Sequence, residues 1–234
     1  MELAAGGAAR TPETNVGDAF TWAFRDPEWV SKLILMGLIG IIPIVGSMQL
    51  LGWMLSTLEN LRAAQQTLPP AAFRYATRGL PLFLAGLIYG VVGLAIFYGG
   101  FFLLFFGVMD LGHPSQTSSH ALPAGFLFLM FGTMSFFFAA TLLLYLLAPV
   151  VILFTDRRGI AGAFDWPGFV HAIRTSPKEA LAAGALALVA YLVSGLGSYL
   201  CYVGLLFTIP YALTIMAWVL RWFELKARPG ALPA

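Results

Sequence analysis

Long apolar stretches without a charged residue alternate with short polar segments along the chain. After the first 32 residues, which mix apolar and charged positions, the stretches cover Leu33–Leu58, Gly79–Met109, Leu111–Thr155 and Ala180–Leu220. A helix needs about 20 consecutive apolar residues to cross the hydrocarbon core of a bilayer. The pattern therefore predicts an all-α membrane protein with four transmembrane helices, over Leu82–Val108, Ala124–Phe154, Ala180–Tyr199 and Leu205–Trp222.

The first apolar stretch, Leu33–Leu58, admits two interpretations. Pro43 lacks a backbone donor and Gly46 is able to adopt a positive φ, so the centre of the stretch favours a turn. Two arms of about 13 residues would each extend about 20 Å, which is too short to span a bilayer. The stretch is either an N-terminal re-entrant hairpin, shielded from lipid by other helices, or a single kinked span. The turn favours the hairpin.

Residues 15–25 and 165–175 have the apolar periodicity of amphipathic helices, and each contains or follows an A-F-x-W motif. Apolar residues recur at helical spacing at Val16, Ala19, Phe20, Ala23 and Phe24, and again at Trp166, Phe169, Val170 and Ile173. The two segments predict cytoplasmic helices that lie in the membrane interface. Candidate membrane-interface residues are Phe20, Trp22, Phe24, Trp29, Trp166 and Phe169.

Helix start signals accompany both segments. Asp26 precedes Pro27 as an N-cap acid would, Asp165 is placed to cap the second segment, and Ser176 with Glu179 has the spacing of a capping box. The similar order of signals indicates a weak parallel repeat of residues 15–60 and 162–225. We expect one polytopic membrane domain over residues 15–225, a flexible N-terminal tail over residues 1–14 and a C-terminal tail over residues 226–234.

Composition supports the membrane class. Hydrophobic residues form 59% of the 234 residues, charged residues form 10%, and the mean hydropathy is +0.84. Soluble domains carry about 25% charged residues, so a water-exposed fold is excluded. The net charge of +2 gives no indication of a nucleic-acid partner. A single cysteine, Cys201, excludes a disulfide framework.

The distribution of lysine and arginine predicts the orientation. Three fall in residues 1–32, three in 59–78, four in 156–179 and three after Leu220, whereas residues 110–123 and 195–204 contain none. By the positive-inside rule the charged segments face the cytoplasm. We therefore expect a multi-pass protein of a prokaryotic inner membrane with a cytoplasmic C-terminus and, with the hairpin, a cytoplasmic N-terminus.

Residues that carry chemistry are scarce in the predicted spans. No acid or base lies in any span core, and the common nucleophile, zinc-protease and phosphate-loop motifs are missing from the sequence. His113 and His120 flank a polar loop, Pro114–Ser119, that reads as a solvated connection. We therefore expect no enzyme activity, no metal site and no cofactor, although contact with a bound lipid or a hydrophobic pigment or quinone is compatible with the aromatic composition.

Glycine and phenylalanine mark a candidate packing surface on the second apolar stretch. Gly86, Gly90 and Gly93 form a small-residue stripe that permits close helix approach. Phe97, Phe101 and Phe105 continue toward the predicted outer end. These six residues are the candidate surface for helix packing or for a partner subunit.

Both ends of the chain resemble a family of uncharacterised prokaryotic membrane proteins, known as a domain of unknown function. The resemblance rests on the opening Ala19–Val30, with its AFxW and RDPEWV sequences, and on the closing motif Tyr202–Ala212, which contains VG and FTIPYA. It implies an inner-membrane protein and supplies no established activity.

These observations favour an integral membrane protein without evident catalytic chemistry. We expect an accessory or scaffold subunit whose partners are the lipid bilayer and other membrane-protein subunits. The alternative is a transporter or flippase for a neutral or lipid-like substrate, which the candidate hairpin and repeat would suit.

Overall fold

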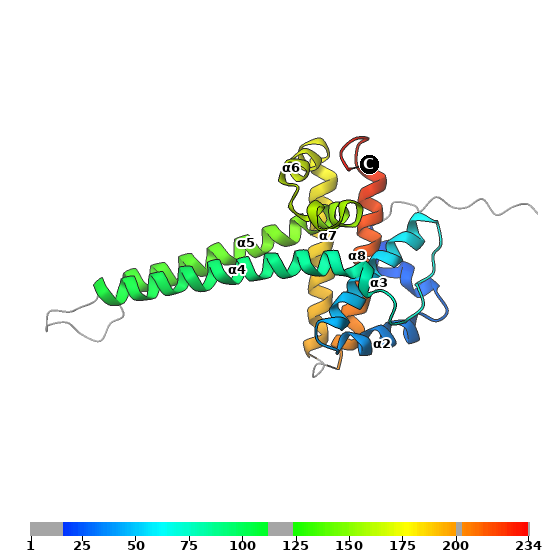
Figure 1. Cartoon of the computed structure of the whole chain (residues 1–234), viewed down its shortest axis with the longest axis horizontal. Coiled ribbons are helices and arrows are strands. Elements are labelled where there is room, and N and C mark those ends of the chain that lie inside the picture. Colours follow the sequence, from blue (N-terminus) through cyan, green and yellow to red (C-terminus); the bar gives the residue numbers. More distant parts are fainter. Residues whose placement is uncertain (1–15, 112–123, 200–202, 234) are drawn as a thin grey trace, which may run out of the picture. The chain divides into compact units, whose positions relative to one another are not determined.

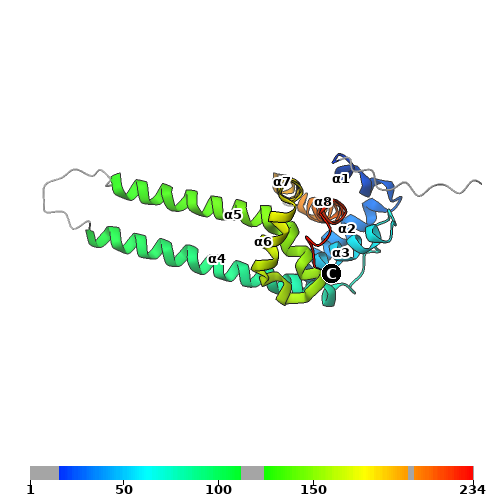
Figure 2. The ribbon, with the colours of Figure 1, turned by 90° about the horizontal axis from the view of Figure 1, so that it is seen from above.

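The computed structural model describes residues 16–111, 124–199 and 203–233, and the regular structure within these ranges is helical throughout. Figures 1 and 2 show the helices, coloured by their position along the chain. The elements are α1 (Asp18–Thr21), η1 (Trp22–Arg25), α2 (Trp29–Gly40), α3 (Val45–Arg62), α4 (Ala76–Leu111), α5 (Ala124–Arg158), η2 (Gly159–Phe164), α6 (Trp166–Thr175), α7 (Pro177–Leu196), η3 (Gly197–Tyr199) and α8 (Leu205–Lys226), where η denotes a 3₁₀ helix. The predicted N-terminal tail and the loop with His113 and His120 lie outside the described residues.

Four helices are long and apolar enough to cross a membrane, which confirms the predicted fold class. They are α4, α5, α7 and α8. Each of them extends beyond its predicted span at one end at least: α4 begins at Ala76, α5 continues to Arg158, α7 begins at Pro177 and α8 continues to Lys226. The extra turns carry polar residues beyond the apolar stretches, because a helix continues wherever its backbone hydrogen bonds and packing allow, whether or not lipid surrounds it.

The stretch Leu33–Leu58 forms two helices, α2 and α3, that pack against each other. This agrees with the hairpin interpretation and not with one continuous span. The predicted role of Gly46 is wrong, because the positive φ falls on Ile44 (φ 64°, ψ −64°). Val45 N donates to Pro43 O at 2.6 Å, which closes a γ-turn around Ile44. Gly46 instead permits close packing, since a Cβ there would lie 2.5 Å from Ile39 O.

The chain divides into two compact units. Unit 1 comprises residues 1–79 and 189–227. In it α8 packs against both α2 and α3, and Trp53, Leu58, Ile215 and Phe223 are fully buried in the core. A Cβ on Gly37 of α2 would lie 1.8 Å from Leu206 O of α8, so glycine is required where these backbones meet.

Unit 2 comprises residues 80–188 and 228–234. In it α5 packs against η2 and α6. The ring of Phe154 in α5 meets the ring of Phe169 in α6 at 5.1 Å between centroids. A Cβ on Gly184 of α7 would lie 2.4 Å from Leu146 O of α5, so these two helices also approach closely.

The helix starts agree only in part with the sequence signals. The Asp165 side chain caps α6 by accepting from Gly168 N at 3.0 Å, as predicted. Asp26 is not the N-cap of α2, which begins three residues later at Trp29. The Ser176 hydroxyl accepts from Arg228 N at 3.0 Å and so holds the segment after α8 within unit 2. Residues 18–25 form one α-helical turn and one 3₁₀ turn in place of a longer amphipathic helix.

Candidate functional site

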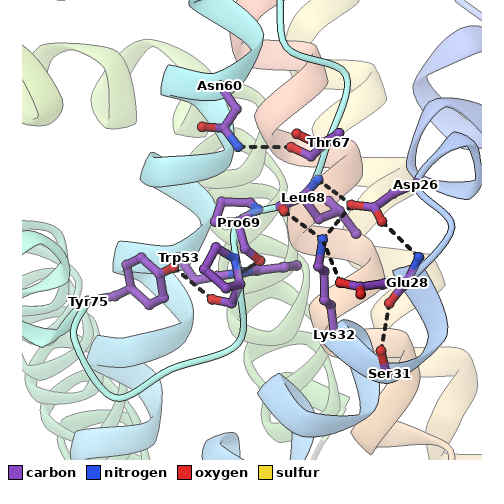
Figure 3. A network of polar contacts seen from close by, with 11 residues as sticks. Asp26, Glu28, Ser31, Lys32, Trp53, Asn60, Thr67, Leu68, Pro69 and Tyr75 are labelled. Carbon is purple, nitrogen blue, oxygen red and sulfur yellow. Dashed lines mark hydrogen bonds and ion pairs between the residues drawn. The ribbon is translucent and has the colours of Figure 1, made fainter.

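The connection between α3 and α4 is held in unit 1 by an unusual set of side chains (Figure 3). Four consecutive backbone carbonyls each accept one hydrogen bond from a side chain. Asn60 Nδ2 donates to Thr67 O at 2.9 Å, Lys32 Nζ to Leu68 O at 3.1 Å, Trp53 Nε1 to Pro69 O at 3.1 Å and Tyr75 Oη to Pro70 O at 2.7 Å. The loop has no regular structure, so these side chains supply the partners that its carbonyls would otherwise lack.

Asp26 lies at the centre of this network. Its carboxylate accepts from Leu68 N at 2.7 Å, Lys32 Nζ at 2.8 Å and Glu28 N at 2.9 Å. Since Lys32 also donates to Leu68 O, the Asp26–Lys32 ion pair holds both the N–H and the carbonyl of one loop residue. We call this arrangement the Leu68 clamp.

Burial and hydrogen bonding act in opposite directions on Asp26. Its side chain is 2% exposed, and burial alone would raise its pKa. The hydrogen bonds from Lys32, Glu28 and Leu68, with the positive charge of Lys32, outweigh burial and hold the pKa of Asp26 below its ordinary value. The carboxylate is therefore ionised throughout the physiological pH range, and the clamp is charged when it forms.

The far end of α3 is joined to the loop by a helix-terminating motif. Gln65 N donates to Asn60 O at 2.8 Å and Ala64 N donates to Leu61 O at 3.2 Å, with Ala64 at φ 57°. This is the Schellman pattern, in which the left-handed position is usually glycine. Gln49 of α3 adds a further anchor, because its Oε1 accepts from Tyr75 N at 2.8 Å.

An open polar depression of about 550 Å³ lies between this loop, α3 and the first turn of α4. Its lining is formed by Ser56, Glu59, Asn60, Gln65, Thr67, Leu68, Pro69, Pro70, Arg74, Tyr75 and Arg78. Arg78 forms an ion pair with Glu59. The Arg74 guanidinium lies 5.4 Å from the centre of the Tyr75 ring. The lining of the depression thus includes two guanidinium groups next to open space, which is a geometry that suits a ligand.

The predicted glycine stripe lies on α4 within unit 2. Gly86, Gly90 and Gly93 are exposed, and a Cβ built on any of them meets no other part of the described chain within 4 Å. Gly100, two turns beyond Gly93, is equally open. Within the described chain, therefore, nothing occupies the close-approach surface that these residues form.

The predicted phenylalanines extend along the same helix. Phe97 contacts Phe137 of α5 with 4.5 Å between ring centroids. Phe101 and Phe105 stack on each other at 6.2 Å along α4. The structure thus places Phe97 between the two long helices of unit 2, and it pairs the other two residues with each other.

The predicted membrane-interface residues differ widely in exposure. Trp22 and Phe169 are each 2% exposed, because Trp22 donates to Thr214 O at 3.3 Å and Phe169 packs on Phe154. Phe20 and Trp29 are half-buried, whereas Phe24 and Trp166 are 43% and 52% exposed. Contact with lipid headgroups stays a prediction for the exposed members of this set.

The Leu68 clamp was missed at the level of sequence. Asp26 was interpreted as a helix cap, and Lys32 only as a topology charge. The available signal was the pair of prolines, Pro69 and Pro70, which follow Leu68 and disfavour a helix there, so that the carbonyls of this segment need other partners. Nothing in the sequence connects that segment to residues more than 30 positions earlier.

The chain matches the model of a known protein family. The model of a family described as "Protein of unknown function (DUF4013)" matches residues 35–203. The Ala19–Val30 opening precedes that range, and most of the Tyr202–Ala212 motif follows it. No curated protein and no solved structure matches the chain significantly.

Proposed function

We propose that this chain, which belongs to the DUF4013 family of proteins of unknown function, is an accessory or scaffold subunit that packs against other components of a membrane. The proposal assigns it no catalytic reaction and no resident cofactor. We further propose that the membrane is the cytoplasmic membrane of a prokaryote. The unequal burial of the apolar helices supports the accessory or scaffold role.

The central helices are the least covered by the chain itself. In their most apolar windows, 11% of residues are buried in α4 and 17% in α5, against 39% in α7 and 44% in α8. A helix that packs on its own chain resembles α7 and α8, with an apolar stripe toward the core. α4 and α5 therefore present apolar surface to their surroundings around most of their circumference.

An exposed apolar helix is stable in contact with lipid alone. The glycine face of α4 is therefore the feature that favours a protein partner. Lipid provides little hydrophobic drive for helix association, and close backbone approach at small residues supplies packing energy instead. Gly86, Gly90 and Gly93 lie at i, i+4 and i+7 on one face, and that face is open. A glycine face of this kind favours another transmembrane helix over flexible lipid chains.

The test replaces two of these glycines and follows both stability and association. We expect the double variant Gly86→Leu, Gly90→Leu to insert and melt like the wild type, because neither new Cβ meets a neighbouring segment. Recovery of a stoichiometric partner, or of a second copy, from native membranes should fall at least about tenfold through loss of close helix approach. Quantitative co-purification in a mild detergent measures this, and thermal melting of the isolated chain gives stability.

A matched control is available on α2. Gly37→Leu makes the same chemical change where a Cβ would lie 1.8 Å from Leu206 O, so it should destabilise the protein itself. A double variant that unfolds as the Gly37 variant does would show that the stripe packs within the chain. A double variant with unchanged stability and unchanged partners would remove the support for a scaffold. In that case a monomer that retains lipid would favour the alternative of a transporter or flippase.

A further inference from the structure

We propose that the depression between α3, the α3–α4 loop and the first turn of α4 binds a phosphate group, carried by a phospholipid headgroup or by a soluble phosphate ester. The site lies in unit 1 and does not involve the glycine face of α4. The phosphate site is therefore tested independently of the proposed scaffold function.

The charge of the lining favours an anion. Arg74 and Arg78 contribute two guanidinium groups, and Glu59 contributes the one carboxylate. Glu59 is engaged in an ion pair with Arg78. Positive charge is therefore in excess at the depression.

Arg74 is placed to bind that anion. Its side chain is exposed, and its contacts are the Tyr75 ring at 5.4 Å and the Tyr75 hydroxyl at 3.4 Å. Among the described residues, no carboxylate forms an ion pair with it. A guanidinium carries five N–H donors in a planar fork that matches the oxygens of a phosphate, so donors remain for a ligand. The Tyr75 ring restrains the group on one side without neutralising its charge.

The other lining groups suit the remainder of a phosphate ester. Ser56 and Thr67 offer hydroxyls, and Asn60 and Gln65 offer amides around the two arginines. Such groups hydrogen-bond ester and glycerol oxygens. The volume of about 550 Å³ exceeds what a bare phosphate needs, and it lies within the range of sites that hold small organic molecules.

The surrounding backbone is fixed before any ligand arrives. The Leu68 clamp and the bonds to Thr67, Pro69 and Pro70 hold the loop wall of the depression. A site built on a restrained loop loses less conformational entropy on binding than a mobile one. The buried Asp26–Lys32 ion pair would thus serve to fix the loop wall of the binding site.

The position in the chain favours the lipid source. Arg74 and Arg78 flank Ala76, where the apolar helix α4 begins. In a bilayer, residues at the start of a spanning helix lie at the level of the headgroups, where basic side chains attract anionic lipids. A soluble phosphate ester reaches the same site from water.

The experiment titrates the full chain in a maltoside detergent, which carries no phosphate. Native mass spectrometry measures binding of phosphatidylglycerol, and a parallel titration with glycerol 3-phosphate tests the soluble source. Arg74→Gln removes the guanidinium group that we propose binds the phosphate. Arg174→Gln removes another exposed arginine, from α6 in unit 2, and is the matched control. We expect Arg74→Gln to weaken binding about tenfold or more, as for loss of a charge-assisted hydrogen bond, and Arg174→Gln to leave it unchanged.

A second variant guards against misfolding. Ser56→Leu fills the depression with an apolar side chain, and among the described residues Ser56 itself holds none of the loop carbonyls, so the variant should also reduce binding while the melting temperature is retained. Arg74-dependent binding of the lipid alone identifies a headgroup site, and Arg74-dependent binding of glycerol 3-phosphate identifies a soluble ligand. Binding that is equal in the wild type, Arg74→Gln and Ser56→Leu, or binding lost equally with Arg174→Gln, would overturn the proposal.

Discussion

Leu68 shows how single residues determine the backbone of unit 1. The residue is 2% exposed in an irregular loop, and its N–H and carbonyl bind the two members of one ion pair. Burying Asp26 and Lys32 costs solvation energy, which their mutual attraction and the bonds to Leu68 offset. The arrangement ties the start of α2 to the loop before α4 through charge and hydrogen bonding rather than through apolar packing.

Removing the Asp26 carboxylate should therefore destabilise the protein, because Lys32 would stay buried without a negative partner. We expect Asp26→Asn to lower the free energy of unfolding by about 3 kcal/mol at neutral pH, since it leaves Lys32, 14% exposed, without its buried partner. Because the folded pKa of Asp26 lies below 3.8, the contribution is fully present above that pH. It is lost as the pH falls through the folded pKa, so the wild type and the variant should converge in acid.

Glu28→Gln is the matched control for this prediction. Glu28 also lies near Lys32, at 3.5 Å, but its side chain is 71% exposed. Loss of its charge should change stability by less than about 1 kcal/mol. Denaturant titrations of both variants between neutral pH and about pH 3 measure the effect. A deficit in Asp26→Asn that persists unchanged in acid would contradict the account of the clamp.

At the scale of helices and turns, the long helices were predictable and several of their ends were not. Uncharged stretches of sufficient length predict α4, α5, α7 and α8, because the length of apolar sequence sets what a bilayer accepts. The turn before α3 was placed correctly from Pro43, although its strained residue is Ile44 rather than Gly46. Residues 18–25 change from an α-helical to a 3₁₀ turn at Trp22, whose Nε1 donates to Thr214 O, 192 residues later. Contacts of that separation leave no trace in local periodicity.

The candidate site follows the same division. The Thr57 hydroxyl of α3 donates to Trp53 O one turn earlier, at 2.9 Å, which is the usual partner of a threonine inside an apolar helix. Gln49 instead reaches the N–H of Tyr75. The depression itself depends on the path of an irregular loop, which is determined by Asp26 and Lys32 from another element. Sequence pattern alone does not predict such a path.

The end of α3 gives a prediction at the element scale. Ala64 occupies the left-handed position of the Schellman motif, where an alanine Cβ costs about 1 kcal/mol. We expect Ala64→Gly to raise the free energy of unfolding by about 0.5–1 kcal/mol and to raise the melting temperature. Ala63→Gly is the control. Ala63 has φ −79°, so glycine relieves no backbone strain there and only increases the conformational entropy of the unfolded chain, which should destabilise the protein. If both substitutions destabilise the protein equally, the left-handed geometry at Ala64 is wrong.

At the scale of the whole chain, the two proposed repeat segments share an order of elements. A short helix is followed by two longer helices in both, as α1 to α3 and as α6 to α8. The helix α2 has 12 residues and extends about 18 Å, too short to span a bilayer, whereas α7 and α8 are each long enough. A first pair that does not fully cross would return the chain to the side on which it began.

This arrangement predicts that both termini face the cytoplasm. Lysine and arginine gather in residues 1–32, 59–78, 156–179 and 221–228, which comprise helix ends and the connections next to them. Reporter fusions at residue 5 and residue 230, read for cytoplasmic activity and for export, measure the orientation of each end. Opposite sides for the two reporters would mean that Leu33–Leu58 crosses the membrane, despite the turn at Ile44.

The central claim is that the open glycine face of α4 contacts another membrane protein, and site-specific photocrosslinking in native membranes tests it most directly. A photoreactive residue at Leu94 lies one helical turn from Gly90 on the same side, and one at Ile88 lies on the opposite side; both positions are exposed. We predict a discrete protein adduct from position 94, its loss in the Gly86→Leu, Gly90→Leu background, and no such adduct from position 88. Lipid adducts alone at both positions, or a protein adduct at position 94 that persists when the glycines are replaced, would contradict the claim.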